Sequence, residues 1–273
     1  MKDNSEQVEY WNGSAGETWV RIQDRIDQLL APMTEVALGK TGLSTGDRAI
    51  DIGCGCGTTS LLLAAQGASV WGVDISAPML RHARERASGQ DKIHFSEGDA
   101  SVQAYTPDHQ LVFSRFGVMF FADPVAAFSN IHSALTEDGR LLFLCWQSPA
   151  NNPWLSVPGA ALQEFRKDEP PEDPQAAGPF AFGDVDYTTG ILTSAGFNDI
   201  QIEEVNKDLT LGDTLDEAVE FQSKIGPLSG VLGQLNKADQ LRATSAVKDA
   251  LAAYVSERGV VMRGAALLVS ARA

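Results

Sequence analysis

The segment from Arg48 to Leu61, RAIDIGCGCGTTSL, most constrains how this chain can fold. A short apolar run ends in one acid, Asp51, three alternating glycines follow, and a second apolar run begins after them. Glycine has no Cβ, so the backbone can turn sharply and a ligand can contact main-chain atoms. The free N–H groups at the start of the next helix would face that ligand. The segment therefore predicts a strand, a ligand-binding turn and a helix.

Strand and helix patterns alternate around this segment, from residue 45 to residue 147. Apolar strands are predicted at residues 49–52, 69–73, 93–97, 111–114 and 141–146, and helices at residues 59–66, 78–87 and 124–135. Repeated βα units with apolar strands are typical of a parallel sheet that helices cover on both faces. We therefore expect an α/β fold.

The regular alternation ends after Trp146. Residues 148–183 hold many of the prolines and a charge cluster at 167–172, and we expect an inserted lid loop there. The complete prediction is a single domain over residues 1–273, with N-terminal cap helices at 1–45, a cofactor-binding core at 46–147, the lid loop at 148–183, a core helix and strand at 184–206, a helical lid insertion at 207–263 with helices at 215–225 and 234–257, and a C-terminal strand at 264–273.

Composition argues against several classes of protein. The formal net charge of −15 disfavours binding to nucleic acid or to an anionic membrane. The sequence has neither the ~20 consecutive apolar residues of a membrane span nor the basic and apolar start of a secretory signal. Three cysteines give no disulfide framework and no paired zinc spacing, so no metal is expected. We expect a cytoplasmic protein, monomeric or homodimeric.

The glycine turn alone leaves the cofactor open. A dinucleotide-binding turn has the pattern G-x-G-x-x-G, which would place its third glycine at position 58, where this chain has Thr58. Gly57 comes one position early. Asp74, at the end of the second predicted strand, could accept hydrogen bonds from a ribose diol in a dinucleotide or in another nucleoside cofactor. Cys54 and Cys56 are interpreted as small filler residues of the tight turn.

Four strand-end motifs together are more specific. Asp51–Gly57, Val73–Ser76, Gly98–Ala100 and Phe113–Phe116 resemble the successive motifs of class I S-adenosylmethionine-dependent methyltransferases. The resemblance covers about residues 10–146, and the stretches SRFGVMFFADPVAAF, NPW and GPFAF resemble a small-molecule branch related to the quinone-biosynthesis methylases. It implies a Rossmann-like fold with a mostly parallel seven-stranded sheet. It also implies S-adenosyl-L-methionine as cofactor and S-adenosyl-L-homocysteine as product.

The resemblance assigns a part of the cofactor to each strand end. Asp51 and the glycine turn would hold the methionine part, Asp74 the ribose hydroxyls, and Asp99 the adenine edge. The full predicted cofactor set is Trp19, Asp51, Gly53, Cys54, Gly55, Gly57, Asp74, Ile75, Met79, Asp99, Ala100, Ser114 and Arg115. For the segment that carries Trp11, Asn12, Trp19 and Gln23, two interpretations remain open. It folds back over the cofactor, as in the related enzymes, or it is a helix that packs its tryptophans on the core.

The substrate side is predicted from aromatic residues and one cation: Arg115, Phe116, Trp146, Trp154, Phe180 and Phe182. Arg115 could hold a substrate anion or pair with a nearby acid of the cofactor site. Methyl transfer is an in-line displacement that needs proximity and a dry pocket, with a general base optional, so no catalytic residue is assigned. The hypothesis is methyl transfer to a small, partly apolar molecule. The alternatives are a nicotinamide-dependent oxidoreductase, which would not need the Asp99-Ala100 element, and a non-catalytic binding module.

Overall fold

The computed structural model describes residues 3–166 and 173–273 of the chain. These fall into two compact units, the first made of Met1–Gln147, Pro174–Val205 and Ala266–Ala273, and the second of Ser148–Asp173 and Asn206–Ala265. The two predicted insertions, 148–183 and 207–263, supply most of the second unit, although residues 174–183 belong to the first. The charge cluster predicted at 167–172 lies outside the described residues.

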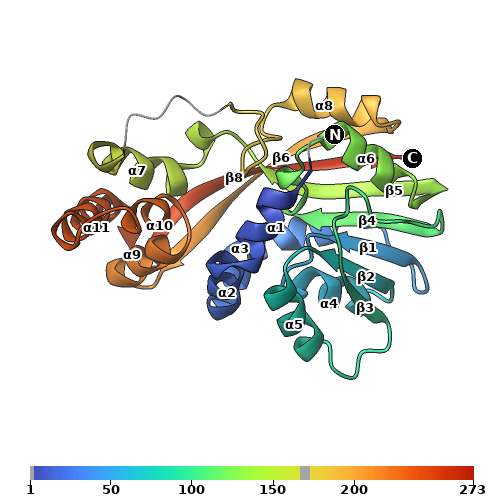
Figure 1. Ribbon diagram of the computed structural model, residues 1–273, viewed down its shortest axis with the longest axis horizontal. Coiled ribbons are helices and arrows are strands. Elements are labelled where there is room, and N and C mark those ends of the chain that lie inside the picture. Colours follow the sequence, from blue (N-terminus) through green and yellow to red (C-terminus); the bar gives the residue numbers. More distant parts are fainter. Residues whose placement is uncertain (1–2, 167–172) are drawn as a thin grey trace. The chain divides into compact units, whose positions relative to one another are not determined.

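A twisted sheet organises the first unit, with its strands side by side in the order β3-β2-β1-β4-β5-β8-β6 (Figure 1). Strands β1 to β5 pair in parallel, and β8 is antiparallel to β5. The strands are β1 (Arg48–Ile52), β2 (Ser69–Asp74), β3 (Ile93–Glu97), β4 (His109–Arg115), β5 (Leu135–Trp146), β6 (Asn198–Gly212) and β8 (Gly259–Arg272), and the two-residue β7 (Val255–Ser256) pairs with β8 outside this order. This confirms the predicted α/β fold with a mostly parallel sheet.

Helices follow the strands as the sequence predicts. The first unit holds α1 (Ser5–Asn12), α2 (Ser14–Arg21), α3 (Gln23–Leu38), α4 (Thr58–Ala65), α5 (Ala77–Arg86), α6 (Pro124–His132) and α8 (Val185–Ser194), and a 3₁₀ turn at Val118–Phe120. Helix α4 packs against β1, β2 and β3, and α6 packs against β5 and α8. The helix predicted at 124–135 ends at His132 because Leu135 already pairs with His109 of β4, which makes β5 longer than predicted.

Aromatic side chains form the centre of the core on one side of this sheet. Phe128, Phe143 and Phe182 are at most 1% exposed, and their ring centroids lie 5.6 to 6.2 Å apart. The prediction that Phe182 lines a substrate pocket is therefore wrong. Burial against two phenyl rings leaves its side chain no surface for a ligand.

The second unit is helical, with α7 (Pro153–Ala161), α9 (Leu215–Lys224), α10 (Pro227–Leu232) and α11 (Lys237–Leu251), and 3₁₀ turns at Pro149–Asn151, Gln163–Phe165 and Ala252–Tyr254. Helix α9 begins with a reciprocal cap between Thr214 and Glu217. Helix α11 begins at Lys237, later than predicted, because the Asn236 side chain accepts hydrogen bonds from the backbone N–H groups of Ala238 and Asp239 and caps the helix there. Helix α7 forms inside the region predicted as a loop.

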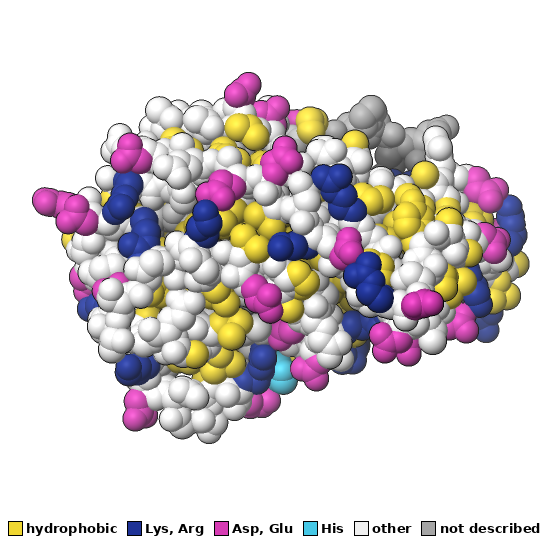
Figure 2. Space-filling model, turned by 180° about the vertical axis from the view of Figure 1, so that it is seen from behind, with side chains coloured by type: hydrophobic (Ala, Val, Ile, Leu, Met, Phe, Trp, Pro, Cys, Tyr) yellow, Lys and Arg dark blue, Asp and Glu magenta, His cyan; other side chains and the backbone are white. Residues whose placement is uncertain are grey.

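Surface charge is mixed on the face that Figure 2 shows, where lysines and arginines are scattered among the acidic side chains. None of the helices in residues 3–166 and 173–273 has the length and apolar character needed to cross a bilayer.

Candidate functional site

Three carboxylates stand at the ends of three adjacent parallel strands. Asp51 is the second-to-last residue of β1, Asp74 ends β2, and Asp99 follows β3 by two residues. The strands are neighbours in the order β3-β2-β1, so their carboxyl ends share one edge of the sheet, where open α/β sheets bind ligands. Burial raises the pKa of Asp51, and the negative charge of Asp74 raises it further.

The glycine bend between β1 and α4 has left-handed backbone at Gly53, Gly55 and Gly57, with φ of 64°, 53° and 80°. A Cβ on Gly53 would lie 2.6 Å from the Cα of Gly117, and one on Gly57 would lie 2.9 Å from Cζ of Phe95. Packing of the protein itself therefore requires these two glycines. A Cβ on Gly55 would meet only the Met79 methyl, at 3.5 Å, so the bend has room at its middle glycine.

Asp51 offers an unpaired acceptor beside this bend. Its side chain is fully buried, and its Oδ2 accepts hydrogen bonds of 2.6 Å from the hydroxyls of Thr59 and Ser60. Its Oδ1 is buried and has no donor among the described residues. Burial raises the pKa of the carboxyl to about 6, against the opposing effect of the two hydroxyls. A cationic donor placed at Oδ1 would satisfy this oxygen and favour the ionised form.

Asp74 ties the bend to the loop after β2. Its Oδ2 accepts a 2.7 Å hydrogen bond from the Gly55 N–H, and its Oδ1 accepts one of 2.8 Å from the Ser76 N–H. Burial raises the pKa of this carboxyl as well. Each carboxylate oxygen has more than one lone-pair direction, so both oxygens can still accept from a ligand hydroxyl.

Asp99 is held by a residue that the sequence analysis missed. The Asn4 side-chain amide donates to both oxygens of Asp99 at 2.9 Å, and the Asn4 carbonyl oxygen accepts from the Ala122 N–H at 2.8 Å. Asn4 thus connects the residue that follows β3, Asp99, to the loop that precedes α6. Its position before α1 suggests only a helix cap, and no hydrogen bond of that kind forms. Ala100, the second predicted adenine contact, is buried.

Helix α1 docks on the loop after β2, next to Asp74. The Asn12 amide donates to the Ile75 carbonyl at 2.8 Å, and its oxygen accepts from the Ala77 N–H at 2.9 Å. The ring of Trp11 packs edge-on against Trp19 at 5.6 Å. The two tryptophans pack on each other and Asn12 binds the loop after β2, but neither observation tests whether this segment covers a cofactor. Cofactor contact by Trp19 stays a prediction.

Arg115 pairs with an acid of helix α3 that the sequence analysis also missed. Its Nη2 lies 3.3 Å from Oδ1 of Asp27, and the other Asp27 oxygen is 3.4 Å from Arg86 and accepts a 2.7 Å hydrogen bond from the Thr58 hydroxyl. Gln23 donates to the Thr58 hydroxyl at 3.2 Å, while its own Oε1 is buried with no donor among the described residues. The site therefore contains a second unpaired acceptor.

The end of β4 positions Phe116 next to Trp146, the last residue of β5. The Ser114 hydroxyl donates to the Ile52 carbonyl at 2.8 Å and accepts from the Gly117 N–H at 3.1 Å, so it fastens β4 to β1. Phe116 has a left-handed φ of 61°, rare for a bulky residue, and its ring stacks on Trp146 at 4.2 Å. The structure brings these two predicted pocket residues together.

The other substrate candidates lie elsewhere in the fold. Phe180 is half-buried in the first unit. Trp154 is buried in the second unit, where its carbonyl accepts from Gln222 at 3.0 Å.

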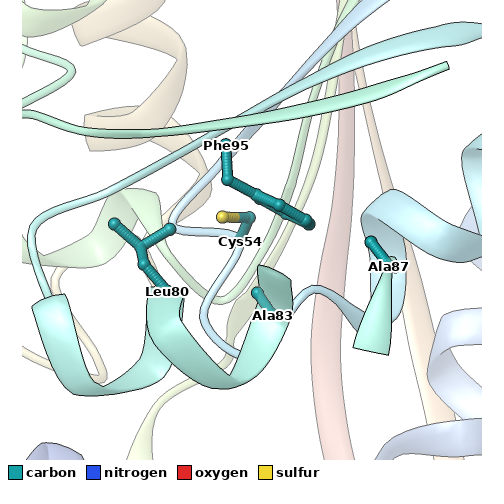
Figure 3. Close-up of a cluster of buried hydrophobic side chains, with 5 residues drawn as sticks. All are labelled: Cys54, Leu80, Ala83, Ala87 and Phe95. Carbon is teal, nitrogen blue, oxygen red and sulfur yellow. The ribbon is translucent and has the colours of Figure 1, made fainter. Parts of the chain in front are cut away.

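Cys54 points away from the bend. Its side chain lies in a cluster with Leu80, Ala83, Ala87 and Phe95, under helix α5 (Figure 3). Burial raises the pKa of its thiol well above the usual range. The Cys54 side chain is therefore part of the core, and a cofactor contact through its backbone stays a prediction. Among the described residues, no three histidine, cysteine or acidic side chains are arranged to hold a metal ion.

Comparisons with known proteins agree with this geometry. Residues 49–139 match the family described as a methyltransferase domain. An uncharacterized protein of Mycobacterium tuberculosis is 25% identical over 168 residues, which are 61% of this chain and 59% of that protein. A demethylmenaquinone methyltransferase of Clavibacter sepedonicus is 31% identical over 105 residues, 38% of this chain and 43% of that enzyme.

The fold is shared with solved methyltransferases. The phosphoethanolamine N-methyltransferase 2 of Haemonchus contortus, in complex with phosphomonomethylethanolamine and S-adenosylhomocysteine, aligns with a TM-score of 0.56 at 21% identity, over 88% of this chain and 52% of that one. Residues 49–139 of this chain are therefore similar to a methyltransferase domain family, and its fold is one that solved methyltransferases share.

Proposed function

We propose that the protein is an S-adenosylmethionine-dependent methyltransferase that acts on a small, partly apolar molecule. The observation that carries the proposal is the row of Asp51, Asp74 and Asp99 at one sheet edge, beside a glycine bend with room at Gly55. The match of residues 49–139 to a methyltransferase domain family supports it. When bound, this cofactor supplies a methyl group on a cationic sulfur that an in-line nucleophile can displace.

The chemistry of the site suits this cofactor. Its methionine part carries an ammonium group, and Oδ1 of Asp51 and Oε1 of Gln23 are buried acceptors with no donor in the described chain. Leaving such acceptors unpaired costs about 1–3 kcal/mol each, so a donor ligand is favoured. Asp74 would hold the ribose hydroxyls, and Asp99 with Ala100 the adenine edge. A row of carboxylates suits a cofactor with two cationic centres better than one with a pyrophosphate.

The remaining residues hold the reactants and exclude water. The stacked rings of Phe116 and Trp146 follow β4 and β5 at the same sheet edge and offer an apolar surface for the acceptor molecule. Arg115, whose charge is engaged by Asp27, positions the strand end. Relatives and structural neighbours carry names with different acceptors, among them demethylmenaquinone, phosphoethanolamine and geranyl diphosphate, and all three are small molecules. We propose a cytoplasmic location, in keeping with three free, buried cysteines.

Calorimetry with three ligands tests the cofactor. We expect about micromolar dissociation constants for S-adenosylmethionine and S-adenosylhomocysteine. Asp74→Ala should weaken both by about 1–3 kcal/mol, because the ribose hydroxyls lose their acceptor. Asp186→Ala, an exposed acid of α8 in the same unit, is the matched control and should bind as the wild type. A preference for NADH, or an unchanged dissociation constant in Asp74→Ala, would contradict the proposal.

Label transfer tests the substrate class. The full chain is incubated with methyl-labelled S-adenosylmethionine and an extract of the native host, and the products are separated by size. We expect label in small molecules. Label in macromolecules alone would refute the small-molecule proposal and leave the cofactor assignment intact.

A further inference from the structure

A cavity lies on the first unit, lined by residues other than the row of carboxylates. It measures about 540 Å³ and is lined by side chains of β5, β6 and β8 and by Lys40, which follows α3. Leu142 and Leu268 form apolar parts of its wall, and Arg140 and Arg272 contribute two guanidinium groups. The proposed methyl transfer makes no use of this cavity.

Two arginines face each other across the strands in this cavity. Arg140 of β5 and Arg272 of β8 are direct partners in the antiparallel ladder, so their side chains emerge on the same face. Like charges in directly opposite positions destabilise a sheet unless a counter-charge lies between them. Within the described chain neither arginine forms an ion pair with an acid. The pair is therefore an electrostatic cost that a bound anion would remove.

Both guanidinium groups are anchored at one point and have donors left over. The Nε of Arg140 donates to the Thr41 carbonyl at 2.6 Å, and Nη1 of Arg272 donates to the Asp138 carbonyl at 3.1 Å. Nη2 of Arg140 is buried and has no acceptor among the described residues. Gly42, with φ of 56°, leaves room for this nitrogen, since a Cβ there would lie 3.2 Å from it. The Arg140 guanidinium is thus held in place with part of its hydrogen-bonding capacity unused.

The charges around the pair leave an excess of positive charge. Three cations line the cavity against two acids, Asp199 and Glu203, and Glu203 is already paired with Lys40 at 3.0 Å. Burial lowers the pKa of Arg140, the charge of Arg272 lowers it further, and Asp47 opposes both.

We propose that Arg140 and Arg272 form a binding site for an oxyanion, either the phosphate or the carboxylate group of a small molecule. Guanidinium groups bind both kinds of oxyanion through paired, charge-assisted hydrogen bonds. The cavity is larger than an oxyanion alone, so it has room for more of the molecule that carries the oxyanion. This site is independent of the proposed methyl transfer.

Anion titrations of the full chain, without S-adenosylmethionine, test this proposal. Inorganic phosphate, butyrate and chloride are added at matched ionic strength, and binding is followed by calorimetry and by the thermal unfolding midpoint. We expect saturable binding of phosphate or butyrate, with no such effect from chloride. Tighter binding of phosphate would identify the ligand as a phosphate ester, and tighter binding of butyrate would identify it as a carboxylate.

Variants locate the site. Arg140→Gln and Arg272→Gln should each weaken the binding about tenfold, the loss expected for one charge-assisted contact. Arg258→Gln, which removes an exposed arginine paired with Asp208, is the matched control and should bind as the wild type. Arg272 is exposed, so its variant decides the question even if Arg140→Gln fails to fold.

Equal effects of chloride, or wild-type binding by Arg272→Gln, would overturn the proposal. Asp74→Ala should keep the anion binding, which separates this site from the cofactor site.

Discussion

Asp51 couples the stability of the protein to pH. Its carboxyl is fully buried and has a folded-state pKa of about 6, raised from 3.8 by burial. Below about pH 4 the carboxyl is protonated in the folded and unfolded states alike. Between pH 4 and 6 the folded state keeps the proton that the unfolded state releases, so stability falls as pH rises and levels off above pH 6. We expect Asp51 to contribute a fall of about 3 kcal/mol over this window.

Denaturant unfolding of the wild type and of Asp51→Asn between pH 4.5 and 7.5 measures this effect. The asparagine does not titrate, so the difference between the two free energies of unfolding isolates the carboxyl from the other acids. We expect the wild type to lose stability relative to the variant as pH rises through 6. A difference that stays constant over the range would show that Asp51 is ionised at all these pH values.

Gly57 and Gly89 separate two reasons for a glycine at a left-handed position, backbone strain and close packing. Both have left-handed φ, of 80° and 81°, so alanine strains the backbone equally at both. A Cβ on Gly57 would meet Phe95 at 2.9 Å and Ala83 at 3.0 Å, whereas one on Gly89 would meet nothing within 4 Å. We expect Gly57→Ala to cost about 1–3 kcal/mol more than Gly89→Ala in urea unfolding, because overpacking adds to strain. Equal losses would rule out packing as the reason for Gly57.

The roles of residues could be predicted from the sequence where a short motif of neighbouring residues marks them. The acids at the strand ends and the glycine spacing are short motifs, and the structure places them at one edge as predicted. Asn4 and Asp27 were missed because each acts on a residue far along the chain, Asp99 and Arg115, and nothing in their own neighbourhood marks that contact. Phe182 was misplaced for the converse reason. An aromatic residue in a loop has the same sequence pattern whether it lines a pocket or fills a core.

Helix α1 is an element held by polar contacts. None of its residues is buried, and it is fixed to the first unit by Asn12, Asn4 and the hydrogen bond from the Ser76 hydroxyl to the Trp11 carbonyl. A helix of eight residues with no buried face has little stability of its own. Its attachment should therefore depend strongly on the two asparagines.

Asn12→Ala tests this dependence by amide hydrogen exchange. Three hydrogen bonds are lost, two to the loop after β2 (to the Ile75 carbonyl and from the Ala77 N–H) and one to the Val8 carbonyl within the helix, so we expect about 1–2 kcal/mol less protection across residues 5–12. Asn236→Ala, which removes the cap of α11, is the reciprocal control and should change exchange in residues 237–251 only. Unchanged exchange in α1 would mean that its tryptophan contacts hold it without Asn12.

Element boundaries were less predictable than the elements themselves. The apolar runs correctly placed β3 and the start of α9, because their limits are set by local patterns. Strand β5 extends back to Leu135 because it finds a partner in His109, and β6 continues to Gly212 although its outer residues are polar. Pairing with a strand that is distant in sequence sets these limits.

For the whole molecule, the proposed cofactor site lies in residues of the first unit alone. Asp51, Asp74 and Asp99 all belong to Met1–Gln147. The two buried oxygens that have no donor among the described residues, Oδ1 of Asp51 and Oε1 of Gln23, lie in the same segment. Binding should therefore stabilise this unit directly. The proposed contacts to the cofactor fall in residues 51–60, 74–79 and 99–101.

Binding of S-adenosylhomocysteine should accordingly protect the first unit from opening. A ligand that binds only the folded state at 100 times its dissociation constant adds about 2.7 kcal/mol of stability. We expect slower amide exchange in the three segments, while exchange in α9 and α11 of the second unit changes less, since no proposed contact lies there. Asp74→Ala at the same ligand concentration is the control, and its weaker binding should reduce the protection. Protection confined to the second unit would place the nucleoside outside the row of carboxylates and refute the site.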